Sequence, residues 1–460
     1  MFSEDTIASV AAGMNASGIG IIRISGPDSF NIISKIFRKK TGISFEELKS
    51  HRVYYGFIFD GDKMLDEVLV IPMKAPKSYT TEDTVEIDCH GGNLVLSNIL
   101  KLVVKNGARI ADPGEFTKRA FLNGRIDLSE AESVMDLIES KNNLALSNSL
   151  KQLTGRLYEK IRTLRQQVLT EIAFIEAALD DPEHISLEGY YEKISEKVDM
   201  LTNEIGRLSA SFNNGRLIKE GIRTVILGKP NVGKSSLLNY ISGAEKAIVT
   251  DIPGTTRDII EENIRLDELS LIVYDTAGIR NSSDPVEKIG VDRARSYANE
   301  ADLIIFVIDS SCPLDENDRE IFEFIKDKKA VILLNKSDLK AFVTKKEISS
   351  LNNGNAPLIS ISVKEGKGFE EFNDIIRSMF LKGDIEYNDE ILIMNERHAS
   401  LLLKALESLK NVKSSIDNNM PEDCLSIDLT DCYDLLGMII GEKTGDEIIN
   451  EIFARFCLGK

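Results

Sequence analysis

The sequence predicts a multidomain α/β protein in which a nucleotide-binding domain interrupts a helical domain. Three patterns support this prediction. A glycine-rich loop at 228–235 stands between a short apolar run and a helical pattern. Residues 1–120 mix strand-like and helical patterns, whereas residues 121–217 and 382–460 are helical almost throughout. A chain of 460 residues also has room for about three domains.

The nucleotide-binding domain is expected to occupy residues 218–381 and to contain a mixed, mostly parallel sheet. Its insertion into a helical domain made of residues 121–217 and 382–460 is the simplest arrangement, because the two ends of a domain usually lie close together. Two unrelated helical domains are the alternative. Residues 1–120 are expected to form a separate α+β domain.

Elements of the outer domains are predicted from local patterns. A nearly unbroken helix is expected at 129–179, opened by Ser129 and Glu132 as a capping box and interrupted at Gly155. The helical pattern that follows is expected to end at 213–215. The expected N-terminal strands are 17–26, 53–60, 67–72 and 84–92, and the expected C-terminal helices are 396–412, 426–441 and 446–456.

Composition limits the classes of function. Apolar residues make up 42% of the chain, yet no apolar run approaches the ~20 residues of a membrane span. No signal-peptide pattern is present, and the five cysteines lack C-x-x-C spacing, so we expect a reducing cytoplasm without a zinc or disulfide framework. The net charge of −18 argues against a general nucleic-acid coat but allows RNA to bind at a local basic surface.

The loop 228–235 has the pattern G-x-x-x-x-G-K-S. Gly228 and Gly233 leave room for backbone N–H groups to surround an anion, and the helix N-terminus that follows adds partial positive charge. Lys234 can reach the β- and γ-phosphates of a nucleotide, and the Ser235 hydroxyl can bind Mg²⁺. The flanking strand and helix argue against the alternative, a glycine-rich turn that binds nothing.

The base is predicted from Asn335, Lys336 and Asp338, which follow a buried-strand run. The Asp338 carboxylate can accept hydrogen bonds from N1 and the exocyclic amine of guanine. Adenine would leave this acceptor unpaired, which makes the wrong base costly. The pattern alone fits an exposed turn, but after a phosphate loop it indicates guanine. Ser360 and Ser362 lie in a segment that resembles the last guanine-binding loop of such proteins.

Two switch motifs lie between the phosphate loop and the base signal. Asp275 ends an apolar strand and can hold Mg²⁺ through water, and Gly278 lets a backbone N–H approach the γ-phosphate. Thr256 is the expected second hydroxyl on Mg²⁺. Four signals in this order predict a Ras-like GTP-binding domain and exclude the permuted GTPases.

Hydrolysis requires a group other than the usual glutamine, because Ile279 cannot orient an attacking water. Asn231 and Glu287 are the candidates. The Asn231 side-chain oxygen can hold a monovalent cation at the phosphates, although asparagine in a tight loop more often serves left-handed backbone geometry. Glu287 lies at an acidic helix start, which the helix dipole favours in any case.

The combined motifs resemble the tRNA-modification GTPase family MnmE (TrmE). They are the phosphate loop 228–235, the segments 254–258 and 275–278, and the C-terminal Cys457–Lys460. Supporting segments are 5–8, 23–26, 89–92 and 113–116, so the resemblance runs from residue 5 to residue 460. It implies an N-terminal folate-binding domain that dimerises, a helical domain, and an inserted G domain with a Ras-like P-loop fold.

The resemblance implies a homodimer that acts with a flavin-dependent partner, MnmG (GidA). Together they install an aminomethyl or carboxymethylaminomethyl group at C5 of the wobble uridine of certain tRNAs, using a one-carbon unit from 5-formyl- or methylene-tetrahydrofolate. GTP hydrolysis with Mg²⁺ is stimulated by K⁺ and by dimerisation of the G domains. No membrane association is implied.

The resemblance also implies roles for residues at matching positions. Glu287 orients the attacking water through a second water, and Cys457 lies near the folate and is needed for modification. Without the resemblance, Cys457 is a small apolar filler at a helix end, and Arg23 and Arg125 are surface ion pairs. Implied ligands are Asn231, Thr250, Ile252 and Thr255 for K⁺, Ser235 and Thr256 for Mg²⁺, and Arg23, Glu86, Arg125 and Lys460 for folate. Implied GTP contacts are Asn231, Val232, Gly233, Lys234, Ser235, Ser236, Thr250, Thr255, Thr256, Asp275, Thr276, Ala277, Gly278, Asn335, Lys336, Asp338, Ser360 and Ser362.

Two other functions are open to a GTP-binding chain of this kind. A ribosome-assembly or RNA-binding switch without modification chemistry predicts a basic appendage after the G domain, and the acidic helical tail speaks against it. A membrane-remodelling GTPase predicts a lipid-facing segment, which the sequence does not contain.

Overall fold

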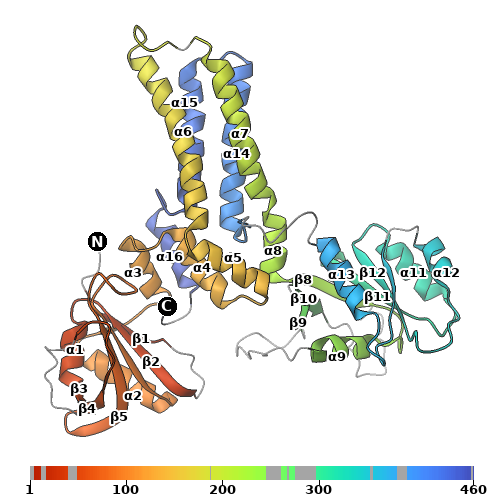
Figure 1. The fold of residues 1–460 in the computed structure, drawn as a ribbon, viewed down its shortest axis with the longest axis horizontal. Helices are drawn as coiled ribbons and strands as arrows, with labels where there is room; N and C mark the ends of the chain where they lie inside the picture. The colour runs from red at the N-terminus through yellow and green to blue at the C-terminus, as the bar shows by residue number, and fades with distance from the viewer. Residues whose placement is uncertain are drawn as a thin grey trace. The chain divides into compact units, whose positions relative to one another are not determined.

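The computed structural model describes residues 5–11, 17–39, 49–186, 188–244, 261–266, 269–274, 297–352, 356–380, 391–456 and 459. The chain forms two compact units (Figure 1). The first comprises Met1–Ile138, Lys151–Leu201 and Lys404–Lys460, and the second comprises Glu139–Leu150 and Thr202–Leu403. The domain boundaries expected after residues 120, 217 and 381 stay a prediction. Within the described part of the chain, no helix combines the length and apolar character that a membrane crossing requires.

A seven-stranded sheet opens the first unit. Its strands are β1 (Ile7–Val10), β2 (Ser17–Ser25), β3 (Phe37–Lys39), β4 (Tyr54–Asp60), β5 (Lys63–Met73), β6 (Thr84–Gly91) and β7 (Arg109–Ile110), in the order β3-β4-β5-β6-β2-β1-β7. Helices α1 (Ser29–Ile36) and α2 (Asn93–Lys105) share one core with inward strand residues such as Ile22 and Ile87, so both helices cover the same face. Alternation along the strands turns the neighbouring Arg23 and Glu86 toward the opposite face.

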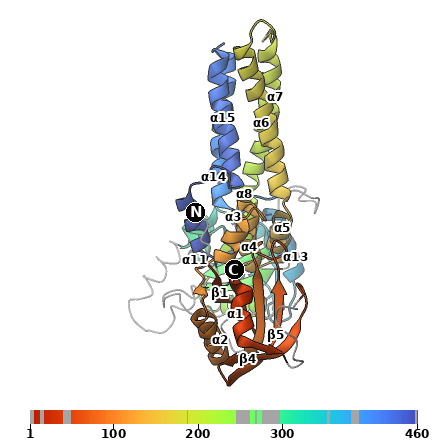
Figure 2. The ribbon, with the colours of Figure 1, turned by 90° about the vertical axis from the view of Figure 1, so that its left-hand side faces the viewer.

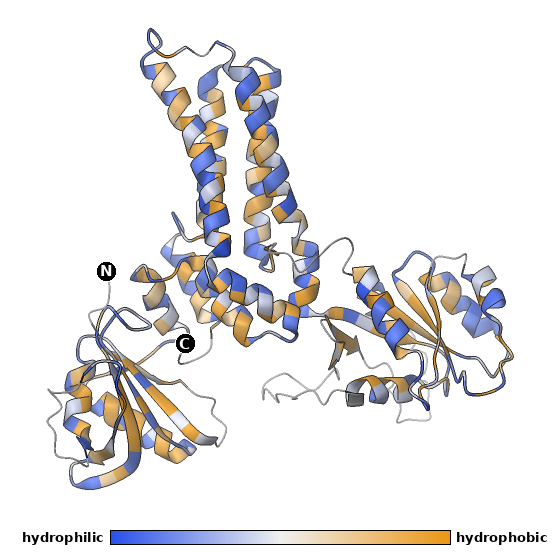
Figure 3. Cartoon of the chain, in the orientation of Figure 1, coloured by the Kyte–Doolittle hydropathy of each residue, from blue (hydrophilic) through white to orange (hydrophobic). Residues whose placement is uncertain are grey.

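Helices make up the rest of the first unit. They are α3 (Glu115–Leu122), α4 (Leu128–Ile138), α6 (Arg156–Asp180), α15 (Glu422–Ile439) and α16 (Asp446–Ala454), while α7 (Tyr190–Ala210) and α14 (Glu396–Asp417) belong in part to each unit. Helices α6 and α15 lie side by side (Figure 2). Bands of apolar residues alternate with polar ones along these helices, as amphipathic packing requires (Figure 3). The buried Arg165 of α6 ties the pair together, since it donates to Tyr433 O at 3.1 Å and pairs with Glu442 at 2.7 Å.

The long helix expected at 129–179 is wrong in its continuity. It is broken both at the expected Gly155 and at residues 139–142, which separate α4 from α5 (Asn143–Leu153). The capping box predicted at Ser129 and Glu132 is also wrong by two residues. Asp127 Oδ1 accepts from Ser129 N at 2.7 Å, and Glu130 Oε2 accepts from Asp127 N at 2.9 Å, so these two carboxylates close the helix start.

The helix end expected at 213–215 is wrong as well. Helix α8 (Phe212–Glu220) runs through this segment. Gly215 lies so close to Ile393 O that a Cβ atom would collide with this carbonyl oxygen. The glycine therefore serves close packing of a helix against a neighbouring backbone, which a local reading cannot distinguish from a helix end.

The second unit contains a six-stranded sheet in the order β13-β12-β11-β8-β10-β9. Its strands are β8 (Ile222–Leu227), β9 (Glu261–Leu266), β10 (Leu269–Tyr274), β11 (Leu303–Asp309), β12 (Ala330–Asn335) and β13 (Leu358–Ser360). All neighbours are parallel except β9 and β10, so the predicted mixed, mostly parallel sheet is confirmed. Helices α9 (Lys234–Ala244) and α13 (Phe369–Phe380) share one core, and α11 (Glu316–Ile325) and α12 (Lys345–Leu351) share another. The sheet is thus covered on both faces, as a sheet of buried parallel strands must be.

Candidate functional site

The phosphate loop lies between β8 and α9, as the sequence predicts. Gly228 and Gly233 have φ angles of 143° and 102°, and Asn231 has 63°. A Cβ atom on Gly228 would collide with Val307 O of β11, and one on Gly233 would collide with the Asn335 amide. Both glycines are therefore required by backbone conformation and by close approach.

Two lysines hold the loop in shape. The Lys234 ammonium lies 2.5 Å from Gly228 O and 2.6 Å from Lys229 O, which places its charge over the loop. Lys229 pairs with Asp315 at 3.0 Å and with Asp318 at 2.7 Å, at the start of α11. Burial opposes the charge of Lys229, but these two carboxylates outweigh that effect and raise its pKa.

Asn335 connects the phosphate loop with the loop that follows β13. Its buried amide donates from Nδ2 to Val232 O at 2.8 Å, and its Oδ1 accepts from Val363 N at 3.3 Å. The sequence indicates only a base contact at this position. In the structure the side chain holds two ligand-facing loops together, because both of its polar ends are used by backbone groups.

Asp338 and Ser362 meet at the predicted base site. Ser362 Oγ donates to Asp338 Oδ1 at 2.7 Å. This hydrogen bond lowers the pKa of Asp338, so the carboxylate stays ionised and able to accept N–H groups. Ser360 is the last residue of β13, so the two predicted serines, Ser360 and Ser362, lie on either side of the buried Ile361.

Lys336 stands beside these residues with a φ angle of 63°. Its ammonium pairs with Asp309 Oδ2 at 2.5 Å. Burial raises the pKa of Asp309, but the hydrogen bonds from Lys336 and Ser311 outweigh burial and leave it below its ordinary value. The loop after β12 is thereby anchored to the end of β11, the neighbouring parallel strand.

The other predicted nucleotide residues divide into two groups. Ser235 and Ser236 are exposed in the first turn of α9, and Val232 is buried beneath the loop. An exposed hydroxyl at this position fits a Mg²⁺ ligand, and the exposed Asn231 fits a cation ligand. Residues that lie outside the described part of the chain are Thr250, Ile252, Thr255, Thr256, Asp275, Thr276, Ala277, Gly278 and Glu287.

A second cluster of predicted residues lies in the first unit. Arg23 of β2 and Glu86 of β6 are cross-strand partners whose Nε and Oε1 atoms are 2.8 Å apart. Arg23 Nη1 also donates to Gly459 O at 3.3 Å. Arg125 Nη1 donates to Tyr79 O at 3.0 Å, and its guanidinium carbon lies 4.8 Å from the centre of the Tyr79 ring.

Tyr79 is the residue of this cluster that sequence reasoning missed. The guanidinium carbon of Arg23 lies 5.5 Å from its ring centre, so both arginines meet at this tyrosine. No motif surrounds Tyr79, and the loop that carries it reaches Arg23 through the pairing of β2 with β6 and through contacts with α3, which include Thr117 Oγ1, 2.9 Å from the Tyr79 hydroxyl. Cys457 and Lys460 lie outside the described residues, although Gly459 between them contacts Arg23.

The chemistry of the cluster suits a ligand that combines a flat polar ring with a carboxylate. A guanidinium pairs with carboxylates, a glutamate accepts ring N–H groups, and a phenol ring packs against a flat surface. The side chains of Arg23 and Glu86 are 16% and 21% exposed, so both are partly accessible while they pair with each other.

Comparison with known proteins identifies relatives over the whole chain. The family model described as GTP-binding protein TrmE N-terminus matches residues 6–125, and the one described as MnmE helical domain matches residues 128–457. Proteins named tRNA modification GTPase MnmE are 53% identical in Lachnoclostridium phytofermentans, 49% in Acetivibrio thermocellus and 42% in Bacillus subtilis. These alignments cover 99%, 100% and 99% of this chain and 99%, 100% and 100% of the relatives, respectively.

Among solved structures, Era of Aquifex aeolicus aligns with 41% of this chain and 66% of its own length, at 29% identity and a TM-score of 0.29. A score this low adds nothing to the fold, which rests on the two sheets and their order. The family is established instead by full-length identity and by two family models that together span most of the chain. The chain therefore belongs to the tRNA modification GTPase family MnmE, whose members hydrolyse GTP in tRNA modification.

Proposed function

We propose that this GTP hydrolase installs a (carboxymethyl)aminomethyl group at C5 of the wobble uridine of certain tRNAs, together with a flavin-dependent partner of the MnmG type. A tetrahydrofolate derivative, 5-formyl or methylene, would supply the one-carbon unit. The observation that carries this proposal is that Arg23, which pairs with Glu86, and Arg125 both meet at Tyr79. The family resemblance assigns folate contacts to Arg23, Glu86 and Arg125, which are far apart in sequence.

Each residue of this cluster has a proposed part in folate binding. Glu86 accepts N–H groups of the pterin ring, and Arg23 and Arg125 attract the carboxylates of the glutamate tail. Gly459 O accepts a hydrogen bond from Arg23, which supports a role for the C-terminal residues beside the folate. Cys457 and Lys460 flank this glycine, and we assign Cys457 to modification and Lys460 to folate binding.

K⁺ is proposed to stimulate hydrolysis, because Ile279 cannot orient the attacking water. Asn231 is exposed in the phosphate loop, so its side-chain oxygen is accessible to a cation beside the phosphates. Such a cation supplies positive charge where the transition state develops negative charge. The proposed K⁺ ligands are Asn231, Thr250, Ile252 and Thr255, the proposed Mg²⁺ ligands are Ser235 and Thr256, and Glu287 is the proposed water-orienting residue.

A homodimer in the cytoplasm is the proposed working form. Tyr55 and Leu69 are cross-strand partners, and both are exposed on the sheet face that also carries Arg23 and Glu86. Exposed apolar residues beside a charged cluster fit a subunit contact better than a free surface. The test is light scattering of the full chain, in which a monomer at micromolar concentration would contradict the dimer.

Deletion of residues 457–460 tests the modification chemistry. We expect GTP turnover to stay at the wild-type rate while the modified wobble nucleoside disappears from cellular tRNA, as measured by mass spectrometry. Retained modification would exclude the role proposed for Cys457. Hydrolysis in KCl and in NaCl tests the cation, and equal rates in the two salts would exclude the K⁺ mechanism.

A further inference from the structure

The loop that carries Tyr79 connects β5 with β6 and has a strained backbone. Thr81, two residues beyond Tyr79, has a φ angle of 62°. A β-branched residue rarely adopts this left-handed conformation, which persists only when surrounding contacts hold it. The position of Tyr79 therefore depends on the contacts that hold the loop.

Buried hydroxyl groups hold the loop from one side. Thr80 Oγ1 lies 2.6 Å from Ser25 Oγ, and Ser25 Oγ donates to Glu82 Oε2 at 2.7 Å. Thr80 and Ser25 are fully buried, as is the adjoining Thr84. Because buried polar groups are costly when unpaired, this network favours one arrangement of the loop.

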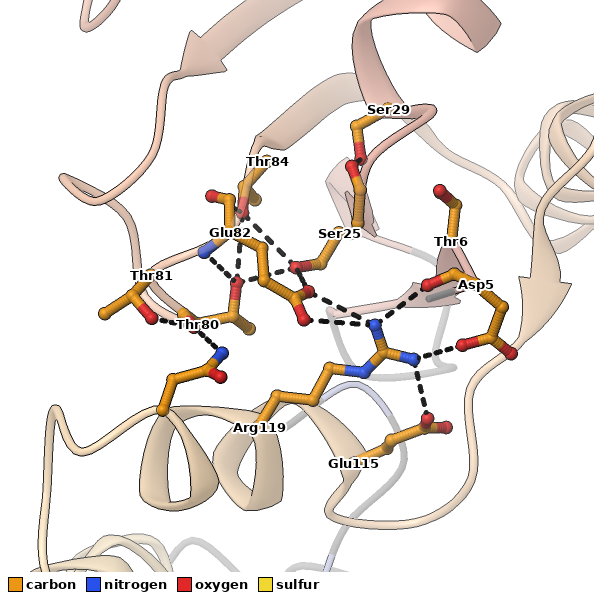
Figure 4. Close-up of polar contacts among 12 residues, drawn as sticks. Asp5, Thr6, Ser25, Ser29, Thr80, Thr81, Glu82, Thr84, Glu115 and Arg119 are labelled. Carbon is orange, nitrogen blue, oxygen red and sulfur yellow. Dashed lines mark hydrogen bonds and ion pairs between the residues drawn. The ribbon is translucent and has the colours of Figure 1, made fainter. Parts of the chain in front are cut away.

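Arg119 of α3 holds the loop from the other side (Figure 4). Its Nη1 lies 3.2 Å from both Glu82 carboxylate oxygens and donates to Asp5 O at 3.0 Å, while its Nη2 pairs with Asp5 at 2.8 Å and with Glu115 at 3.0 Å. The side chain is 8% exposed. Burial opposes its charge, but the facing carboxylates outweigh burial and raise the pKa of Arg119. A buried cation with these partners leaves Glu82 little freedom to move.

The same chain segment continues into the folate cluster. Asn123 Nδ2 donates to Thr80 O at 2.7 Å, and Arg125, two residues further on, donates to Tyr79 O at 3.0 Å. Two tethers of the loop, Arg119 and Asn123, therefore belong to the same short segment as Arg125, and this segment starts in α3.

We infer that Arg119 and Glu82 are positioning residues for the folate cluster, because their ion pair fixes the loop that carries Tyr79 and so keeps Arg23 and Arg125 in place. The inference rests on the folate binding proposed above. It requires that loss of the tether weakens folate binding and leaves GTP turnover unchanged, since the phosphate loop belongs to the other compact unit.

The test measures binding of 5-formyltetrahydrofolate to the full chain by calorimetry, with GTP turnover and thermal unfolding as parallel readouts. We expect Glu82→Ala to raise the Kd about tenfold, because the loop must then be ordered on binding. Glu82→Gln keeps an acceptor for Ser25 and should recover part of this loss. Asn123→Ala removes one hydrogen bond of an exposed side chain and should raise the Kd a few-fold.

Arg109→Ala is the matched control. Arg109 pairs with Asp5 and with Glu115, each at 2.7 Å, so it belongs to the same charge cluster but is no tether of the loop. We expect this variant to lose thermal stability while its Kd stays at the wild-type value. An equal rise in Kd for Arg109→Ala would mean that general loss of stability explains the effect, and the inference would be wrong.

Other outcomes separate the two proposals. Wild-type affinity in Glu82→Ala excludes positioning but leaves folate binding intact, whereas a wild-type chain that does not bind the folate overturns both. Should Glu82→Ala not fold, Glu82→Gln and Asn123→Ala decide the matter, since wild-type affinity in both excludes positioning.

Discussion

Asn335→Ala should loosen the phosphate loop and weaken GTP binding. The substitution leaves the buried Val232 O without its 2.8 Å donor, which costs about 1–3 kcal/mol. The longer 3.3 Å bond from Val363 N, which is partly exposed, contributes about 0.5–1 kcal/mol. The free energy of unfolding of this unit should fall by about 1.5–4 kcal/mol in total. Because GTP must reorder the loosened loop, its Kd should rise about tenfold, the equivalent of ~1.4 kcal/mol.

Asn352→Ala is the matched control for this prediction. Asn352 also bonds a backbone pair, with Nδ2 donating to Ala356 O at 2.7 Å and Oδ1 accepting from Ala356 N at 3.3 Å, but it follows α12 and both bonds run to Ala356 rather than to the phosphate loop. Titration with a fluorescent GTP analogue and urea unfolding measure both variants. Equal GTP affinity in Asn335→Ala and Asn352→Ala would refute the cross-linking role of Asn335.

Three further predictions concern single side chains. Asp338→Asn should lower the affinity for GTP about a hundredfold or more while that for xanthosine triphosphate rises, and competition binding in which GTP still wins would contradict guanine recognition by this carboxylate. Gly233→Ala should abolish GTP binding in equilibrium titration, because a Cβ would collide with Asn335 and the φ angle of 102° disfavours alanine. Burial raises the pKa of Glu130 to about 7, so between about pH 4.5 and 7 the folded chain holds a proton that the unfolded chain lacks, and stability falls as pH rises through this window. Unfolding midpoints at about pH 5 and about pH 7.5 should therefore differ less in Glu130→Gln than in the wild type, and an identical difference would refute the assignment.

Local chemistry made much of the second unit predictable. The glycines of the phosphate loop need positive φ angles and close approach of the backbone. Both glycines lie within one short motif, so the sequence alone reveals them. Strands β8, β10 and β12 coincide with the apolar runs beside the nucleotide motifs, because a strand buried on both faces is rich in apolar residues. The order of four motifs then determined the nucleotide and the fold class.

Contacts between distant segments decided what the sequence could not. The break at 139–142 has no glycine or proline; it arises where the buried Asn142 donates to Ile218 O at 2.7 Å and caps α5 by accepting from Ala145 N at 2.8 Å. Helical periodicity continues through such a site, because the hydrogen bond that holds Asn142 outside the helix runs to Ile218, far along the chain.

The residues of the folate cluster likewise divide into those that the sequence indicates and those that only the structure reveals. Family motifs marked Arg23, Glu86 and Arg125, whereas Tyr79 and its tether through Arg119 emerged only from the pairing of β2 with β6 and the packing of α3. The sequence by itself determined the nucleotide chemistry, since that chemistry resides in short contiguous loops. Only the tertiary structure decided which loop supports the second cluster, because an ion pair between residues 37 positions apart leaves no trace in local pattern.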